Sequence, residues 1–484
     1  MSETAPTAAP VSAPSSTSPV AGVRGGDTGG FPLLRGERTW GFWSFTSVNV
    51  SMAIATWAFL TGGSIALFVG AQAAVATMVV GNLVGVVLVA LTTCVPSAKY
   101  GVEQFVALRS VLGRNGVRLL LALLLPCLLA TWNAILAIMI GRALTNISNA
   151  LLGTELRQDS PVVIGLCLFA LALAWILLLR GSSAVSRVNN LVAPVLAVLT
   201  LLMLVVILRE HGPAELTALA PLDPVGLPLL DYTIALELCL GAGFSWWAIT
   251  GNLARLTPTP RVAFWPNLIG LFAASTVAGL VGCFAALAFD SSDPTTWLIP
   301  IGGVALGSLA LLFVAFANLT SMVGQTYSGA LSVQRLHQGL RRLPWSLLAA
   351  LLLVPGAVMV FFPGGVYDLF FRFLALVSLV IAPLCAVYFA DFYLLRRRTL
   401  HLRDLYIEDS ESRYGFWRGF NPVAFVSVAA GTLTYLALLN PFTFESAALF
   451  PYLTASLPAF AATALVHVLL TRTIVRPLNK GGYK

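Results

Sequence analysis

Apolar runs of about 20 residues follow one another along most of this chain, from residue 40 to residue 473. In helical form, a run of that length crosses the hydrocarbon core of a bilayer, which is about 30 Å thick. The chain is 58% hydrophobic and only 10% charged, whereas roughly a quarter of the residues in a soluble domain are charged. The sequence therefore predicts an all-α, polytopic membrane protein.

Gly, Pro and charged residues separate the apolar runs and set approximate boundaries for about twelve transmembrane helices. The runs are much longer than membrane strands and do not alternate with period two, which argues against a sheet. The expected spans are residues 40–63, 71–95, 118–144, 160–179, 186–208, 230–250, 263–289, 299–330, 344–362, 364–394, 419–440 and 448–473.

The positive charges are distributed unevenly between the two sides of this predicted bundle. If the N-terminus is cytoplasmic, all but four of the 28 Lys and Arg residues fall in cytoplasmic segments; the exceptions are Arg142, Arg157, Arg209 and Arg372. The positive-inside rule then places both termini in the cytoplasm, in a multi-pass protein of the cell membrane. Topology and attraction to anionic lipid account for the net charge of +8, so no nucleic-acid partner is expected.

Composition divides the chain into a core and its attachments. The first segment is rich in Ser, Thr, Ala and Pro and lacks an apolar signal segment, which is typical of a disordered tail. The scattered cysteines and histidines predict neither disulfides nor a metal cluster, and no cofactor is expected. The predicted organisation is a disordered cytoplasmic tail (1–38), a ten-helix transport core (39–398), a cytoplasmic loop (399–418), two further transmembrane helices (419–473) and a cytoplasmic tail (474–484).

Polar side chains inside the apolar runs concentrate in helices 1, 3, 6 and 8, and Thr56 of helix 1 is one of them. Such side chains are costly in lipid and mark candidate sites. Many transporters consist of two inverted repeats, each opening with a broken helix that binds substrate or ion. A five-plus-five repeat with broken helices 1 and 6, followed by two C-terminal helices, fits this placement. Gly241 and Gly243 are predicted to unwind helix 6.

Helix 6 contains a polar stripe in which Glu237, Gly241, Phe244 and Ser245 share one helical face. This face is predicted to line a pocket, where a protonated carboxyl pairs with the ring nitrogen and amino group of an aminopyrimidine. Trp246 would add an aromatic face to the pocket. In the alternative interpretation, Glu237 lies near the outer end of the helix, solvated or paired with a polar group, and Trp246 faces lipid.

Helix 8 carries a second candidate site, because Ala317, Thr320 and Ser321 stand at i, i+3 and i+4. One carbonyl and two hydroxyls would then face a common point, as a hard cation such as sodium prefers. Alternatively, the hydroxyls bond back to the helix backbone. One turn further, Gln325 either reaches the substrate or makes a packing hydrogen bond.

Five motifs occur in order along the chain: Thr61-Gly-Gly63, Gly81-Asn82, Lys99-Tyr-Gly101 with Arg109, ANLTSMVGQTYSGAL from Ala317, and PLCAVYFADFYLLRRR from Pro383. Together they resemble the nucleobase:cation symporter-1 family of cytosine, purine, hydantoin and hydroxymethylpyrimidine permeases. The similarity extends over nearly the whole chain after residue 38. Within that family, ALELCLGAGFSW from Ala235 is most similar to the hydroxymethylpyrimidine branch, although residues 251–255 depart from its Asp-Tyr-Ser-Arg pattern.

The resemblance implies roles for further residues. Trp132 would stack on a planar ring, with Asn133 beside it, and backbone carbonyls of Ser51 and Ile54 would complete the sodium site. The implied function is a symporter that imports a nucleobase-like heterocycle, such as hydroxymethylpyrimidine, cytosine, a purine or a hydantoin. Sodium or protons would be the coupling ions, transport would proceed by alternating access, and the expected state is a monomer surrounded by lipid.

Other functions are possible on the same scaffold. An amino-acid:cation symporter is the main alternative, but SMAIATW from Ser51 lacks the glycine expected at a carboxylate site in helix 1. The helices contain no paired aspartates, HExxH motif or Ser/His dyad, so no enzymatic activity is expected. The lack of charged rings argues against a channel.

Overall fold

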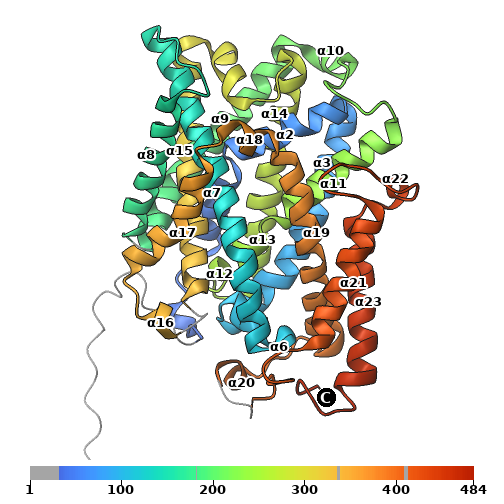
Figure 1. The fold of residues 1–484 in the computed structure, drawn as a ribbon. Coiled ribbons are helices and arrows are strands. Elements are labelled where there is room, and N and C mark those ends of the chain that lie inside the picture. Colours follow the sequence, from blue (N-terminus) through green and yellow to red (C-terminus); the bar gives the residue numbers. More distant parts are fainter. Residues whose placement is uncertain (1–31, 181, 335–337, 408–411, 484) are drawn as a thin grey trace, which may run out of the picture.

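The computed structural model in Figure 1 describes residues 32–180, 182–334, 338–407 and 412–483 as a bundle of long helices. Among these residues, β structure is confined to two isolated bridges, Trp417 with Phe420 and Leu439 with Ser446. Within the described ranges, nine helical segments are long and apolar enough to cross a membrane, a bent pair forms a tenth span, and two shorter apolar helices cover 345–359 and 422–438. The twelve expected spans coincide with these segments, which confirms the all-α class.

The spans comprise the following helices in chain order. The first half contains α1 (Phe42–Ala53), α2 (Thr56–Phe68), α3 (Ala71–Val89), α4 (Val95–Tyr100), α7 (Arg114–Leu152), α8 (Pro161–Leu178) and α9 (Ser182–Glu210). The second half contains α11 (Pro228–Phe244), α12 (Trp247–Ala254), α13 (Pro260–Asn267), α14 (Ser275–Phe289), α15 (Pro294–Val333), α17 (Trp345–Met359) and α19 (Phe370–Phe389). Two more helices follow, α21 (Pro422–Leu438) and α23 (Ser456–Leu470).

Short helices connect several of these spans. They are α5 (Gln104–Ala107), α6 (Arg109–Leu112), α10 (Gly212–Ala218), α16 (Gln338–Arg341), α18 (Pro363–Asp368), α20 (Leu402–Tyr406) and α22 (Phe450–Leu453). The long helices pack in pairs, with α15 along α7, α14 along α2 and α11 along α3. On one flank, α21 and α23 pack against each other and against α19 (Figure 1).

The first and sixth spans are both interrupted. Helices α1 and α2 are bent by 52°, and between them Ala55 has extended dihedrals (φ −135°, ψ 170°). In the sixth span, Ser245 and Trp246 separate α11 from α12. At the first break, backbone groups lose their helical partners and become available to ligands. The interruption of the sixth span is slighter, because Ser245 keeps helical dihedrals and its N–H still donates to the Gly241 carbonyl at 2.9 Å.

The predicted unwinding at Gly241 and Gly243 is wrong, because both glycines lie inside α11. They permit close helix packing instead. A Cβ atom on Gly241 would lie 2.4 Å from the Leu374 carbonyl oxygen, and one on Gly243 would lie 2.8 Å from Cα of Gly85. Small residues of this kind bring membrane helices together, so the break itself occurs just after the glycines.

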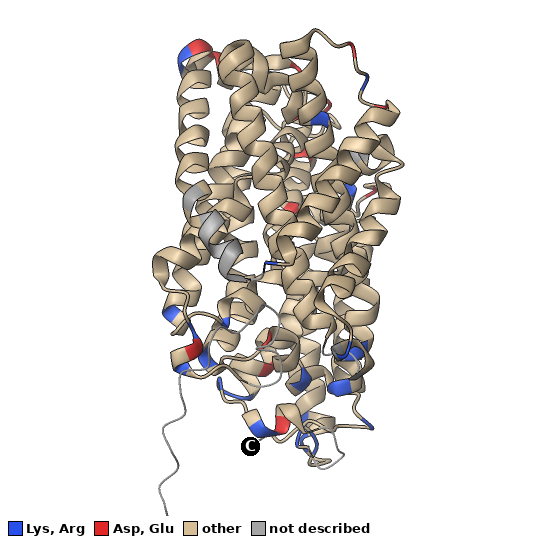
Figure 2. Cartoon of the chain, turned by 90° about the vertical axis from the view of Figure 1, so that its left-hand side faces the viewer, with Lys and Arg blue, Asp and Glu red and all other residues tan. Residues whose placement is uncertain are grey.

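The basic residues gather at the end of the bundle that carries the C-terminus (Figure 2). At the same end, part of the expected N-terminal tail is attached to the core: the Leu33 N–H donates to the Gly101 carbonyl at 2.9 Å, and Nη1 of Arg38 donates to the Ala98 carbonyl at 2.7 Å. Residues 33–38 therefore belong to the folded part, whereas residues 1–31 of the expected tail lie outside the described residues.

Candidate functional site

A small cavity lies where the two helix breaks meet. Its volume of about 20 Å³ is enough for roughly one water molecule. Residues of α1, α2, α7, α12, α15 and the break in the sixth span surround it. They are Met52, Trp57, Trp132, Leu136, Ser245, Trp246, Ile249, Ser321 and Gln325.

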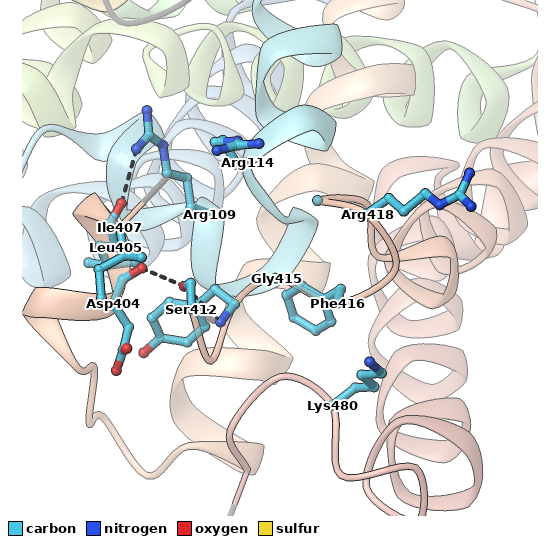
Figure 3. A pocket seen from close by; sticks show the side chains of 12 residues that line it. Arg109, Arg114, Asp404, Leu405, Ile407, Ser412, Gly415, Phe416, Arg418 and Lys480 are labelled. Atoms are coloured by element: carbon cyan, nitrogen blue, oxygen red, sulfur yellow. Dashed lines mark hydrogen bonds between the residues drawn. The ribbon is translucent and has the colours of Figure 1, made fainter. Parts of the chain in front are cut away.

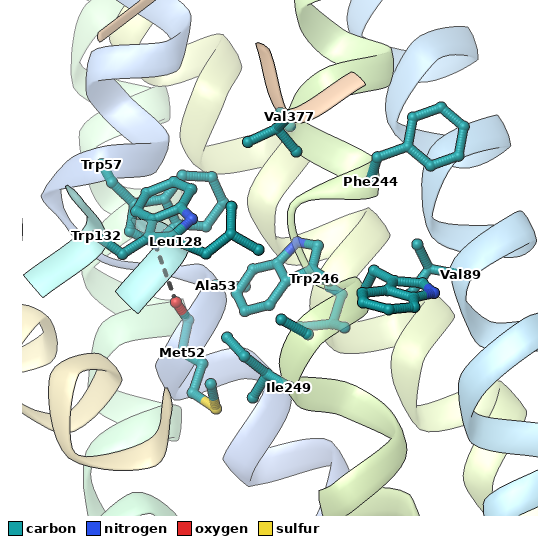
Figure 4. Packing of buried hydrophobic residues seen from close by; sticks show 14 of the residues in the cluster. Met52, Ala53, Trp57, Val89, Leu128, Trp132, Phe244, Trp246, Ile249 and Val377 are labelled. Carbon is teal, nitrogen blue, oxygen red and sulfur yellow. Dashed lines mark hydrogen bonds between the residues drawn. The ribbon is translucent and has the colours of Figure 1, made fainter. Parts of the chain in front are cut away.

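Three tryptophan rings dominate the wall of this cavity (Figure 4). Trp57 makes edge-to-face contacts with Trp132 and Trp246, at centroid distances of 5.5 and 5.3 Å. Phe373 of α19 contacts the other side of Trp132 at 5.3 Å. Edge-to-face pairs add about 0.5–1.5 kcal/mol each to the burial of the rings. The wall of the cavity is therefore aromatic, with its rings packed edge to face.

Trp57 is a site residue that the sequence analysis missed. Its Nε1 donates to the Met52 carbonyl at 3.1 Å, so the indole bridges the break between α1 and α2. The available signal was its position, since a large aromatic stands at the start of α2, one turn after the expected ion-binding carbonyls. Its side chain is 4% exposed, and it couples the geometry of the break to the tryptophan cluster.

The side-chain amide of Gln325 forms the polar end of the cavity, and the side-chain amide of Asn133 holds it in place. Nε2 of Gln325 donates to Oδ1 of Asn133 at 2.6 Å, and Nδ2 of Asn133 donates to the Thr326 hydroxyl at 3.2 Å. Asn133 thus lies behind Gln325 and orients it without lining the cavity. Gln325 keeps its second N–H and its carbonyl oxygen for other partners, which suits the edge of a heterocycle.

Four of the residues predicted for substrate binding come together at the cavity: Trp132, Ser245, Trp246 and Gln325. Ser245 lies in the break, where its hydroxyl donates to the Ala242 carbonyl at 2.6 Å. Thr56 lies at the other break, outside the cavity lining, and is bonded there to Asn318. Its N–H donates to Oδ1 of Asn318 at 2.8 Å, and its hydroxyl accepts Nδ2 of the same residue at 2.7 Å.

Glu237 does not line this cavity, which corrects the predicted placement. Its carboxylate accepts the backbone N–H groups of Ala455 and Ser456 at 3.0 and 3.1 Å, and also the Ser456 hydroxyl. One turn earlier on the same face, the Thr233 hydroxyl donates to the Pro451 carbonyl at 2.7 Å. This face of α11 is turned toward α22 and α23, so Glu237 caps the N-terminus of α23.

Phe244 also lies outside the cavity lining, at the end of α11. Its ring points away from the three tryptophans (Figure 4). The face of α11 that was predicted to line one pocket therefore packs against other helices. Only Ser245, where α11 ends, reaches the cavity.

The residues predicted for the ion lie where α15 meets the break in the first span. The Ser321 hydroxyl donates to the Met52 carbonyl at 3.1 Å, whereas the Thr320 hydroxyl donates within its own helix to the Ala317 carbonyl at 2.9 Å. Ile54 follows α1 with a non-helical ψ of 80°, and Ser51 is buried in its last turn. This set offers only hydroxyl and carbonyl oxygens, a chemistry that fits a hard monovalent cation.

Comparisons with known proteins find similar chains over most of the length. A family model described as a permease for cytosine/purines, uracil, thiamine and allantoin matches residues 32–454. A purine-uracil permease of Arabidopsis thaliana is 24% identical over 429 residues, covering 83% of this chain and 69% of that one. A hydantoin permease of Microbacterium maritypicum is 23% identical over 443 residues, covering 83% of each.

Among solved structures, a nucleobase-cation-symport-1 family transporter in a closed conformation with bromovinylhydantoin bound has a similar fold. Its TM-score is 0.75 at 19% identity, covering 93% of this chain and 96% of that one. An inward-facing structure gives a TM-score of 0.74 at the same identity, covering 94% and 96%.

Proposed function

The chain belongs to the family of permeases for cytosine/purines, uracil, thiamine and allantoin, and on that premise we propose that it is a symporter for a planar, neutral, nucleobase-like heterocycle. The observation that carries this proposal is the tryptophan-lined cavity at the two helix breaks. All of its lining side chains are uncharged, so the substrate is recognised by stacking and by hydrogen bonds. Alternating access would expose this central site to each side of the membrane in turn.

Within this class, we favour a pyrimidine such as hydroxymethylpyrimidine. Its ring would insert between Trp132 and Trp246, and its polar edge would meet Gln325 and Ser245. The amino-acid alternative is less well supported, because an ionised amino acid would find no charged side chain in the lining. With the correction at Glu237, recognition of the ring edge rests on neutral amide and hydroxyl groups.

Sodium is the coupling ion we propose. Carbonyls of Ser51, Ile54 and Ala317 and hydroxyls of Thr320 and Ser321 would hold it, and binding there would link α15 to the break between α1 and α2. The existing Ser321 to Met52 hydrogen bond supports this bridge. The tryptophan cluster is tied to the same break, since Trp57 also donates to the Met52 carbonyl.

The remaining features of the proposal concern the setting of the protein. The concentration of Lys and Arg at the C-terminal end (Figure 2) supports a cytoplasmic location for both termini under the positive-inside rule. We propose a monomer in the cell membrane, with lipid around its transmembrane helices and no nucleic-acid partner.

Trp132→Ala is expected to weaken substrate binding by about 1–3 kcal/mol, because one stacking face and its buried area are lost. The purified protein would be titrated with hydroxymethylpyrimidine, cytosine, uracil, purines, hydantoins, allantoin and amino acids, with tryptophan fluorescence or thermal stabilisation as the signal. Trp175→Ala is the matched control, because that indole lies outside the cavity and donates to the Ser346 carbonyl. Stabilisation by amino acids alone, or equal losses in both variants, would refute the proposed site.

Thr320→Ala is expected to abolish the sodium dependence of substrate affinity while leaving sodium-free binding nearly unchanged. If sodium and substrate favour the same conformation, each raises the affinity for the other by one common factor, typically about 5–150-fold. Titrations of substrate with and without sodium, and of sodium with and without substrate, measure that factor. Thr320 suits this test because Ser321 also lines the substrate cavity.

Ser308→Ala supplies the matched control for the sodium experiment, because Ser308 is a buried serine of the same helix. It stands roughly 18 Å along the helix axis from Thr320. Wild-type protein that ignores sodium but responds to pH would show that protons are the coupling ion. An unchanged sodium effect in Thr320→Ala would place the ion elsewhere.

A further inference from the structure

Asn318 of α15 holds the start of α2 through both polar atoms of its side chain. Oδ1 of Asn318 accepts the Thr56 N–H at 2.8 Å, and Nδ2 donates to the Thr56 hydroxyl at 2.7 Å. Both residues are 0% exposed, and 262 positions separate them in sequence. The first break is therefore held from another helix by a buried, neutral amide.

The start of α2 receives no cap from the residue that precedes it. The first N–H groups of a helix lack intrahelical partners, and a polar side chain at the N-cap usually accepts from one of them. The N-cap residue of α2 is Ala55, which makes no such bond. Asn318 supplies the missing acceptor from α15, so the position at which α2 begins depends on α15.

The other side of the same break is also bonded to α15. The Ser321 hydroxyl, one turn further along α15, donates to the Met52 carbonyl near the end of α1 at 3.1 Å. Trp57, the neighbour of Thr56, donates to the same carbonyl at 3.1 Å. Hydrogen bonds thus connect α15, the last turn of α1 and the first turn of α2.

The wall of the substrate cavity contains Trp57 but neither Thr56 nor Asn318. Trp57 makes edge-to-face contacts with Trp132 and Trp246, so a shift of α2 would change the packing of all three rings. Asn318 can therefore influence a bound ring through the position of Trp57, without touching the ring itself.

We propose that Asn318 is a positioning residue for substrate binding, because it fixes α2 so that Trp57 keeps its place in the cavity wall. The inference rests on the proposed function, in which this cavity receives a planar heterocycle. When the bonds to Asn318 are absent, α2 occupies other positions as well, and the arrangement that binds the ring becomes a smaller fraction of the population. The apparent affinity falls in proportion to that fraction.

The test compares variants of the full chain in detergent. N318A removes both hydrogen bonds to Thr56, T56V removes only the one to the hydroxyl, and T56S keeps both. The probes are hydroxymethylpyrimidine, cytosine, uracil, adenine and hydantoin. Isothermal titration calorimetry gives the dissociation constant of each probe, and the Tm is measured on the same samples without a probe.

Two hydrogen bonds elsewhere in the chain supply the controls. N82A is the matched one, because Nδ2 of Asn82 on α3 donates to the Thr276 hydroxyl on α14 at 3.1 Å, a buried bond between an asparagine and a threonine of another helix. Neither residue lines the cavity. S412A removes a bond beside α20, in which the Ser412 hydroxyl donates to the Asp404 carbonyl at 2.7 Å (Figure 3).

N318A is expected to bind the preferred probe about tenfold more weakly than wild type, the scale of one buried hydrogen bond lost from the binding-competent arrangement. T56V should lose less affinity than N318A, and T56S should bind more tightly than T56V. N82A should lower the Tm without changing the affinity, and S412A should leave the affinity unchanged.

A double variant distinguishes positioning from an independent effect on binding. If Asn318 acts through Trp57, N318A adds little to the affinity loss of W57A, whereas independent losses would multiply. T56V provides the same comparison in a milder form if N318A folds poorly.

Wild-type affinity in N318A, an equal loss in N82A, or multiplied losses in N318A/W57A would each overturn the inference and leave the proposed function standing. Wild type that binds none of the five probes would refute the proposed function and this inference together.

Discussion

Replacing Arg396 with methionine is expected to destabilise the protein by about 3–5 kcal/mol, because the buried carboxylate of Asp391 loses its arginine partner and keeps only Tyr483 and, at 3.8 Å, His467. Nε of Arg396 lies 2.6 Å from Oδ2 of Asp391, and their side chains are only 3% and 0% exposed. Asp391 lies at the end of the tenth span, in the short helical segment Ala390–Leu395. The pair is the most deeply buried ion pair between Asp and Arg in the described chain.

The same ion pair ties the C-terminal tail to the bundle. Arg396 donates to the carbonyls of Gly481 and Ser110 at 2.8 and 2.7 Å, and its guanidinium lies 4.0 Å from the centre of the Tyr483 ring. The Tyr483 hydroxyl donates to Oδ1 of Asp391 at 2.5 Å. Burial, reinforced by the negative charge of Asp391, raises the pKa of Tyr483 well above 10.0, so this hydroxyl remains a donor at neutral pH.

Thermal unfolding in detergent measures the effect. A double-mutant cycle separates the interaction energy of Asp391 with Arg396 from the effects of the two single substitutions. Arg396→Met alone should lower the Tm sharply, whereas Asp391→Asn combined with Arg396→Met should recover part of the loss because no unpaired charge remains. Arg157→Met is the control, since its partner Asp159 is exposed and the Tm should not change. Similar Tm values for wild type and Arg396→Met would show that water or another group compensates the buried carboxylate.

The sequence predicted the membrane spans well because each helix depends on local properties. A run of apolar residues satisfies its backbone hydrogen bonds internally and crosses the bilayer whatever its neighbours are. The positions of the breaks were less predictable. The glycines of the sixth span lie inside α11 and pack directly against Leu374 and Gly85, and those contacts come from two distant helices.

The candidate site was only partly predictable from the sequence. Trp132, Trp246 and Gln325 were identified through family resemblance and polar placement, and they share one cavity in the structure. Helical periodicity states which residues share a face, but it does not state what that face contacts. The face of Glu237 meets the N-terminus of α23, a contact between residues more than 200 positions apart.

Glu237→Leu is the second large effect, with an expected destabilisation of about 2–6 kcal/mol. It leaves the N–H groups of Ala455 and Ser456 buried without an acceptor, and each such group costs about 1–3 kcal/mol. Glu237→Gln retains an acceptor oxygen for these donors and should cost much less. Glu155→Leu, in an exposed connecting segment, controls for the change in charge and hydrophobicity.

Substrate titrations on the same variants show whether Glu237 connects α11 to α23 or binds the substrate. Because Glu237 is absent from the cavity lining and bonds to the start of α23, the folded fraction of both variants should bind the heterocycle with wild-type affinity. A Tm loss in Glu237→Leu without an affinity loss in Glu237→Gln is the expected pattern. A weaker affinity in Glu237→Gln at unchanged Tm would contradict this assignment. It would show that the Glu237 carboxyl contacts the substrate, because a residue that only caps α23 should change stability and not affinity.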